Sequence, residues 1–259
     1  MRYREFAPGP RASRFVECFW TLDGAAEGTV QRVVPDGRCE LILNLREPFE
    51  ALDGATWRRQ PECFLAGQIT GPLLLRAGSC SRMIGIRFRP GGVAQLLGVP
   101  ADELAGRSID ARDLGLGALR SVGSVDEAEQ IVLERERGAA DAVMDEAVRL
   151  LSRDGEVGGA ARALGLSTRH LERRFKARVG MSPKHFARIV RFQRVFGAVE
   201  GGGSGWVEAA AACGYYDQAH LIRDFRDLAG EAPSHLMGGD ELARHFLSHF
   251  SKTGKATRA

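Results

Sequence analysis

Four charged residues in the second half of the chain stand at helical spacing and could bind nucleic acid. Arg169, Glu172, Arg173 and Lys176 occupy positions i, i+3, i+4 and i+7, so a helix places all four on one face. Arginine forms bidentate hydrogen bonds with guanine, and both arginine and lysine attract phosphate groups. This face could therefore bind DNA, with its arginines suited to reading bases and its lysine suited mainly to adding positive charge.

The helix that carries this face belongs to a unit that occurs twice in the chain. Residues 164–186 read LGLSTRHLERRFKARVGMSPKHF, and residues 213–236 read CGYYDQAHLIRDFRDLAGEAPSHL. The second copy has one extra residue between its glycine and its first shared leucine. On the corresponding face it holds Ala219, Ile222, Arg223 and Arg226. Four residues recur fifty positions later: Leu171, Phe175, Gly180 and Pro183 correspond to Leu221, Phe225, Gly230 and Pro233.

Each copy predicts a helix, a tight turn and a second helix. An alanine-rich segment, which favours helix, ends at Gly165 in the first copy and at Gly214 in the second. Ser167 and Asp217 follow, and both are preferred N-caps for a new helix. Two helices joined by a glycine turn, with a basic outer face on the second, are typical of a helix-turn-helix. The second helix of such a unit enters the DNA major groove.

These two segments closely resemble the DNA-binding domain of the AraC/XylS family of bacterial transcription regulators, over about residues 139–240. The resemblance implies two units, about 157–180 and 206–230, in adjacent major grooves of double-stranded DNA. It also implies a linker helix that opens at Pro183 and RNA polymerase as a partner, and it leaves the roles of activator and repressor both open. The base-reading positions that it implies are Arg169, Glu172 and Arg173 in the first unit and Gln218, Ala219, Ile222 and Arg223 in the second, with His220 nearby.

The two copies differ in charge. Residues 160–199 contain ten Arg or Lys and one acid, whereas residues 200–236 contain two Arg and six acids. Because DNA attracts cations through its phosphates, the first unit is predicted to supply most of the electrostatic attraction.

The second copy also departs from the family pattern. Residues 201–205 read GGGSG, which predicts either a loose joint between the linker helix and the second unit or an ordinary solvated loop. Ala219 and Ile222 stand where polar residues could read base edges. Ile222 either touches a thymine methyl group or packs within the protein.

The first half of the chain predicts short strands instead. Apolar and aromatic segments at about 14–21, 29–34, 39–45, 63–69, 73–76 and 83–88 alternate with turn residues, and helical spacing follows at 93–97, 125–137 and 139–151. The predicted fold class is two-domain α+β. Residues 1–138 form a small β-sandwich or cupin-like barrel with flanking helices, residues 139–240 form the all-α tandem helix-turn-helix domain, and residues 241–259 form a tail.

The β domain is predicted to sense an effector or to mediate dimerisation. Its segments ECFWTLDG, VVPDGRCELILN and IGIRFRPGG resemble an N-terminal domain found in a subset of AraC-type regulators. Trp20, Phe64 and Phe88 could line a cavity, with Arg87 or Arg89 meeting an anionic small molecule. The competing interpretation is that the aromatic residues form the core and the arginines face solvent. The remaining alternative is a constitutive DNA-bound scaffold whose β domain only forms a homodimer.

The residue counts argue against metal and cofactor chemistry. All six His residues lie after residue 169, so the β half cannot form a multi-histidine metal site. No phosphate loop, dinucleotide fingerprint or nucleophile elbow occurs, so no catalytic residue, metal or cofactor is predicted. The isolated carboxylates Asp36 and Glu40 are assigned to a surface turn.

The cysteines bear on the rival function, an enzyme or DNA-repair protein fused to an AraC-type module. A repair protein needs an activated Cys in the β half, and no Cys there has a nearby His. The five Cys lack any C-x-x-C and are predicted to be reduced thiols, buried except for Cys80 in a loop. No apolar run approaches a membrane span, and the first residues do not form a signal peptide, which predicts a cytoplasmic protein without membrane contact.

Overall fold

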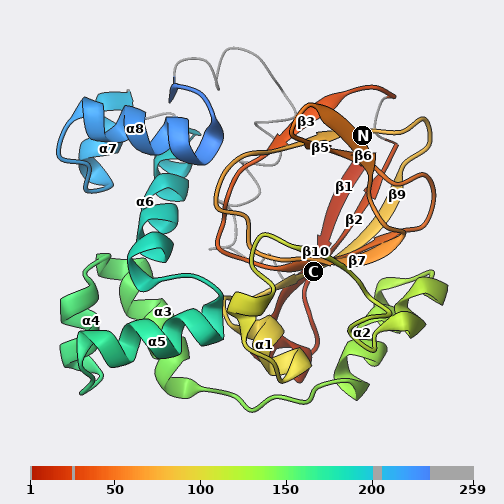
Figure 1. Ribbon diagram of the computed structural model, residues 1–259, viewed down its shortest axis with the longest axis horizontal. Helices are drawn as coiled ribbons and strands as arrows, with labels where there is room; N and C mark the ends of the chain where they lie inside the picture. The colour runs from red at the N-terminus through yellow and green to blue at the C-terminus, as the bar shows by residue number, and fades with distance from the viewer. Residues whose placement is uncertain (1, 25–26, 201–205, 234–259) are drawn as a thin grey trace.

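The computed structural model describes residues 2–24, 27–200 and 206–233 of the chain. Two parts lie side by side, a β-rich N-terminal part and an all-helical C-terminal part (Figure 1). This arrangement confirms the predicted fold class. The glycine-rich segment 201–205, the histidines His235, His245 and His249 and the predicted tail 241–259 lie outside the described residues.

The larger of two antiparallel sheets forms the centre of the N-terminal part. Both faces of this sheet are buried. In strand β2, successive side chains alternate between the two faces, with Cys18, Trp20 and Leu22 on one face and Phe19 on the other. The edge strand β1 exposes four of its five residues, so no alternation marked it in the sequence. The strand order is β1 (Arg2–Phe6), β2 (Val16–Asp23), β9 (Arg82–Phe88), β4 (Glu40–Asn44), β7 (Cys63–Ala66) and β10 (Ser108–Asp110).

The smaller sheet covers one face of the larger sheet. The turn Pro35-Asp36-Gly37 joins β3 to β4, but these strands lie in different sheets, so the turn is a crossover between sheets. Gly37 has a φ of 77°, which favours glycine at this turn. Strands β5 and β6 carry mostly charged and small residues and were not predicted. The strand order is β3 (Val30–Val33), β8 (Leu73–Arg76), β5 (Glu50–Asp53) and β6 (Thr56–Arg59).

Each face of the larger sheet has its own core. Trp20 and Met83 pack between the two sheets, and Gly85 leaves room for the Trp20 indole, which a Cβ at this position would overlap. On the opposite face, Phe19, Ile86 and Phe88 pack against a layer of short helices. These helices are η1 (Ala12–Arg14), α1 (Gly92–Leu97), η2 (Ala101–Glu103), η3 (Gly117–Ser121) and α2 (Val125–Glu134).

The C-terminal part consists of two three-helix units around one continuous core. Figure 1 shows α3, α4 and α5 at one end of α6 and α7 and α8 at its other end, so α6 belongs to the second unit and also links it to the first. The repeat that the sequence shows over two helices therefore extends to three. No helix in the described part of the chain is both long and apolar enough to span a membrane. The helices are α3 (Ala142–Asp154), α4 (Val157–Ala163), α5 (Thr168–Val179), α6 (Pro183–Glu200), α7 (Trp206–Ala212) and α8 (Gln218–Ala229).

The β part contacts equivalent points of both units. The Gln68 side chain donates a hydrogen bond to the carbonyl of Val179, the last residue of α5. Arg32 donates to the carbonyl of Ala229, the last residue of α8, at 2.8 Å. Since Val179 and Ala229 are fifty positions apart, the β part binds the same C-terminal carbonyl in each copy of the repeat.

Candidate nucleic-acid interface

The turns of both units begin their second helices as the sequence predicts. Gly165 and Gly214 adopt left-handed φ values of 65° and 84°. Ser167 accepts a hydrogen bond from the His170 backbone N–H at 3.2 Å. Asp217 accepts the equivalent bond from His220 at 2.6 Å. Each cap satisfies a free N–H group of the first turn and so fixes where the exposed end of the helix starts.

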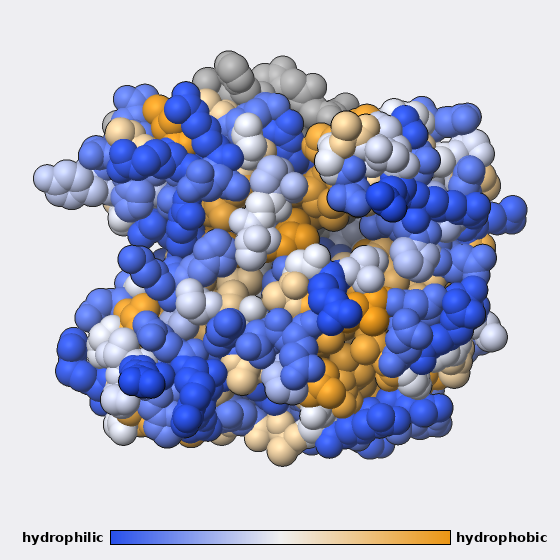
Figure 2. Space-filling view, in the orientation of Figure 1, coloured by the Kyte–Doolittle hydropathy of each residue, from blue (hydrophilic) through white to orange (hydrophobic). Residues whose placement is uncertain are grey.

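The outer face of α5 is free to meet a ligand. Arg169, Glu172, Arg173 and Lys176 are all exposed, while Leu171 and Phe175 on the other side are fully buried. Lys176 Nζ lies 4.0 Å from a carboxylate oxygen of Asp102 on η2, so the β part partly balances its charge. The surface over α4 and α5 is predominantly hydrophilic (Figure 2).

Most other cations of the first copy already have partners. Arg174 pairs with Asp141 on α3 at 3.0 Å, and Arg178 donates to the Ala139 carbonyl at 2.9 Å. Arg162, Arg188, Arg191 and Arg194 are likewise engaged in ion pairs or hydrogen bonds to carbonyls. Of the ten Arg and Lys within 160–199, three make no ion pair and no side-chain hydrogen bond with described residues: Arg169, Arg173 and Lys184.

The outer face of α8 is also accessible but carries fewer side chains that can form hydrogen bonds or ion pairs. Gln218, Ala219, Arg223 and Arg226 are exposed, and Ile222 is half-buried. Neither arginine forms an ion pair with a described residue. The half-exposed Ile222 is compatible with both of its interpretations, contact with a thymine methyl group and packing.

His220 belongs to the packing between α8 and α6. Its ring lies 5.0 Å from the Tyr215 ring in an edge-on arrangement, and its Nε2 lies 3.2 Å from the Arg191 guanidinium. The resemblance placed His220 near the base-reading residues. In the structure its backbone N–H serves the helix cap, and its ring turns toward α6.

A buried carboxylate, Asp224, joins α8 to α6. Its side chain is only 4% exposed and accepts hydrogen bonds from Arg188 at 2.6 Å and from Arg191 at 3.2 Å. Arg188 also pairs with Asp227 at 2.5 Å. Two cations counted with the first copy therefore neutralise two acids counted with the second.

Sequence reasoning missed this cluster, although a signal was present. Asp224 lies at i+3 from Leu221 and directly before Phe225, so it stands on the buried stripe of α8. A carboxylate on such a stripe needs a buried partner. The sequence does not specify which arginine supplies it, because the partners come from another helix.

The candidate effector residues of the β part do not converge on one cavity. Trp20 packs between the two sheets, whereas Phe88 packs on the opposite face of the larger sheet against the helices. Phe64 is also buried. Arg89 lies beyond the end of β9, is exposed and donates to the Ser13 carbonyl at 2.7 Å. The prediction that these residues line one site is therefore wrong.

Arg87 is already balanced by carboxylates. Its side chain is 3% exposed and lies 2.7 Å from Glu40 and 3.3 Å from Glu5. Trp20 Nε1 also donates to Glu40 at 3.2 Å. Glu40 thus belongs to a charged cluster on β4 and not to a surface turn, which corrects the sequence-based assignment. Burial raises the pKa of the Glu40 carboxyl, and the Arg87 guanidinium opposes this shift.

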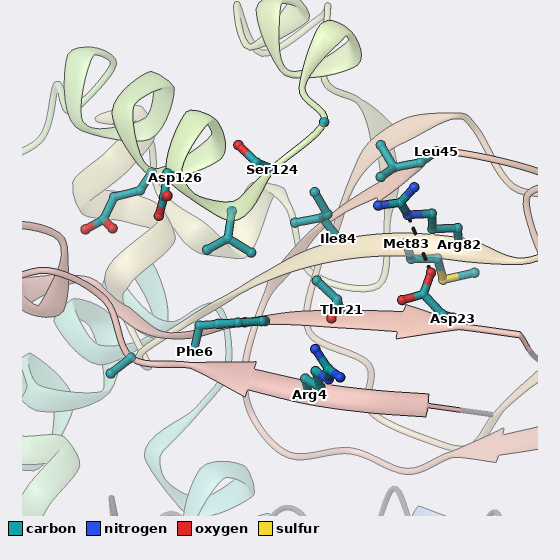
Figure 3. A pocket seen from close by; sticks show the side chains of 14 residues that line it. Arg4, Phe6, Thr21, Asp23, Leu45, Arg82, Met83, Ile84, Ser124 and Asp126 are labelled. Atoms are coloured by element: carbon teal, nitrogen blue, oxygen red, sulfur yellow. Dashed lines mark ion pairs between the residues drawn. The ribbon is translucent and has the colours of Figure 1, made fainter. Parts of the chain in front are cut away.

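A cleft of about 780 Å³ lies elsewhere on the β part, between the start of α2 and strands β1, β2 and β9. Figure 3 shows Arg4, Asp23 and Arg82 on its strand side and Ser124 and Asp126 on its helix side. Arg82 pairs with Asp23 at 3.4 Å. The volume of the cleft is in the range of small-molecule sites. The sequence gave no signal for this cleft, because its lining residues come from distant segments.

Four of the five thiols are partly or fully buried. Burial raises the pKa of Cys18, Cys39 and Cys63 to about 12. Cys213 is half-buried and its pKa is also raised by burial. Cys80 is exposed, as the predicted loop position implied. No group of His, Cys, Asp and Glu suitable for a metal ion occurs among the residues that the structure describes.

Two family models match the chain, one within the β part and one within the helical part. Residues 4–110 match a family described as "Domain of unknown function (DUF6597)". Residues 160–238 match a family described as "Helix-turn-helix domain". No curated protein matches the chain.

Solved structures of ToxT from Vibrio cholerae are similar to the chain. ToxT from strain O395 bound to (E)-4-(8-methylnaphthalen-1-yl)but-3-enoic acid shares 11% identity at a TM-score of 0.49, over 88% of this chain and 99% of that chain. Unsaturated fatty acid bound wild-type ToxT from strain SCE256 shares 11% identity at a TM-score of 0.42, over 83% of this chain and 92% of that chain. With its two capped units and the family match over residues 160–238, the C-terminal part of this chain is an AraC-type helix-turn-helix domain.

Proposed function

We propose that this protein is a sequence-specific DNA-binding transcription regulator. The observation that carries the proposal is the pair of capped helices, α5 and α8, which expose their N-terminal residues from one continuous core. In a helix-turn-helix these are the residues that reach base edges in the major groove. Arg169 and Arg173 support base reading because no described carboxylate competes for their guanidinium groups.

The separation of the units supports binding to two neighbouring grooves. Helix α6 has 18 residues and is therefore about 27 Å long, at 1.5 Å per residue. Successive major grooves on one side of B-DNA lie roughly 34 Å apart. A linker helix of this length can place one unit at each of two adjacent grooves.

The position of the β part is compatible with DNA binding. It contacts α5 and α8 at their last carbonyls, Val179 and Ala229, whereas base reading uses the other ends of these helices. Residues 139–240 are therefore proposed to bind double-stranded DNA with the β part docked. RNA polymerase is the further partner that the family resemblance implies, in the cytoplasm.

The β part is proposed to sense a small-molecule effector or to pair two subunits. The cleft between α2 and strands β1, β2 and β9 supports effector binding by its size. A metabolite screen by thermal shift tests this role. A metabolite that raises the melting temperature of the native protein, but not of a Thr21→Trp variant with a filled cleft, would place the effector there. The mass in solution with and without that metabolite tests pairing.

In vitro selection from a library of random duplexes tests DNA recognition directly. The full chain is expected to enrich one sequence class and to bind it far more tightly than random DNA. The logarithm of its affinity should fall linearly with the logarithm of salt concentration. Enrichment of no duplex, or equal affinity for selected and random DNA, would contradict the proposed function. The exposed variant Arg58→Ala on β6 serves as the matched control, because it removes an arginine remote from both reading helices.

A further inference from the structure

The turn of the second unit contains one inserted residue. Leu166 is the single residue between Gly165 and the N-cap Ser167 in the first unit. In the second unit Tyr215 and Tyr216 separate Gly214 from the N-cap Asp217. One of the two tyrosines is therefore an added residue.

Backbone hydrogen bonds identify Tyr216 as the insertion. The Leu166 N–H donates to the Ala161 carbonyl at 2.9 Å, and the Tyr215 N–H donates to the Ala210 carbonyl at 3.0 Å. Each bond closes the preceding helix in the same way, five residues back. Tyr215 is also 6% exposed and packs in the helical core, which Leu166 borders. Tyr215 therefore takes the place of Leu166, and Tyr216 has no counterpart.

The inserted side chain projects into solvent. Tyr216 is 94% exposed, while the other exposed large hydrophobic residues of the described chain are 37–41% exposed. It makes no hydrogen bond or ring contact with a described residue. An aromatic ring with a polar tip gains free energy when a partner covers it, and leaving it in water contributes nothing to the fold.

The insertion lies at the reading end of α8. Tyr216 directly precedes the N-cap Asp217, and the exposed Gln218 and Ala219 follow. When the first residues of a recognition helix reach base edges, the chain just before them passes the sugar-phosphate backbone at the edge of the groove. A tyrosine hydroxyl there can donate to a phosphate oxygen, and its ring can cover a deoxyribose.

The second unit has few other means of binding the backbone. Arg223 and Arg226 are the only cations within residues 200–236, and Ala219 and Ile222 offer no hydrogen bond to a base. A neutral aromatic contact adds affinity without counterion release.

We propose that Tyr216 is a DNA contact of the second unit, which binds the sugar-phosphate backbone beside the base pairs that Gln218 and Ala219 face. This inference rests on the proposed DNA-binding function. It goes beyond that function because it assigns a role to a residue that the recognition-helix pattern does not include.

Chemical modification of tyrosine tests the contact on the native protein. The chain contains three tyrosines, and Tyr3 is half-buried and bonded to Glu5 at 2.8 Å while Tyr215 is buried. Nitration followed by peptide mass spectrometry should therefore modify Tyr216 fastest. A saturating amount of a duplex selected from the random library should slow this reaction about tenfold and leave Tyr3 unchanged. Bound duplex with an unchanged rate at Tyr216 would overturn the proposal.

Two substitutions separate contact from mere proximity. Tyr216→Ala should weaken binding to the selected duplex about tenfold, and Tyr216→Phe, which loses only the hydroxyl, should fall between this variant and the native protein. Both should keep the native salt dependence, because tyrosine is neutral, and the native melting temperature. The control Arg226→Ala should flatten the salt slope by about one unit. Native affinity in Tyr216→Ala would overturn this inference alone, whereas failure of the native chain to select any duplex would overturn the proposed function with it.

Discussion

The two helix-turn-helix units carry opposite charges at the same place. Arg174 and Asp224 are fifty positions apart and both stand beside the buried stripe of their second helix. Arg174 pairs with Asp141 of α3 and keeps 33% of its side chain exposed. Asp224 pairs with Arg188 and Arg191 of α6 and keeps 4% exposed. The opposite charge comes from α3 in the first unit and from α6 in the second, so equivalent positions of the two units accommodate opposite charges.

The difference shows which interactions stabilise each unit. A half-exposed ion pair in water contributes little to stability, whereas a buried carboxylate that loses its partners is costly. The second unit therefore depends on the Asp224 cluster, and the first depends mainly on its apolar stripe. The contact of Phe192 with Phe225, with ring centroids 4.8 Å apart, adds an apolar part to the attachment of the second unit.

The largest expected effect concerns DNA affinity. The double variant Arg169→Ala with Arg173→Ala should abolish measurable specific binding at physiological salt. Each bidentate arginine contact contributes roughly 1–3 kcal/mol, so the loss of two removes roughly 2–6 kcal/mol, which is about thirtyfold or more in affinity. The double variant Arg223→Ala with Arg226→Ala should leave detectable binding with an altered site length. Titration at fixed salt checks both, and equal losses would contradict a dominant first unit.

The next effect concerns stability. Asp224→Ala should lower the free energy of unfolding by about 3 kcal/mol, because it leaves Arg188 and Arg191 without their buried anion. The equivalent variant Arg174→Ala should cost only about 1 kcal/mol, because its ion pair is partly exposed. Chemical denaturation measures both. The exposed variant Arg149→Ala on α3 is the control and should stay within about 0.5 kcal/mol of the native protein.

A smaller effect separates base reading from charge on α5. Arg173→Ala should lower the ratio of specific to random affinity, with relaxed preference at one base pair. Lys176→Ala should weaken all DNA alike and flatten the salt slope by about one unit. Asp102→Asn should raise affinity slightly, because its carboxylate lies 4.0 Å from Lys176 Nζ. An unchanged affinity ratio in Arg173→Ala would exclude the base-reading role.

The smallest effect concerns thiol reactivity in the two parts of the chain. Titration of the native protein at neutral pH should show one fast thiol, Cys80, which is exposed. Cys18, Cys39 and Cys63 should react only after unfolding, because burial raises their pKa to about 12 and leaves almost no thiolate. A second fast thiol in the β part would favour the rival repair function.

The sequence alone determined the local features of the helical part. Ser167 and Asp217 cap the second helices, and Gly165 and Gly214 end the first ones, because each of these residues acts on its own backbone neighbours. The buried stripes of α5 and α8 likewise follow from a period of 3.6 residues. Most strands of the β part were found for the same reason, since alternation along one strand is a local pattern.

Only the tertiary structure decided how distant segments meet. The placement of β3 and β4 in different sheets, and of Trp20 and Phe88 on opposite faces, depends on strand pairing that no local pattern encodes. The bonds from Gln68 to the Val179 carbonyl and from Arg188 to Asp224 join residues 111 and 36 positions apart. Charge counted along the chain assigned Arg188 and Arg191 to the first unit. Their side chains neutralise the second unit, because electrostatic energy depends on distance in space.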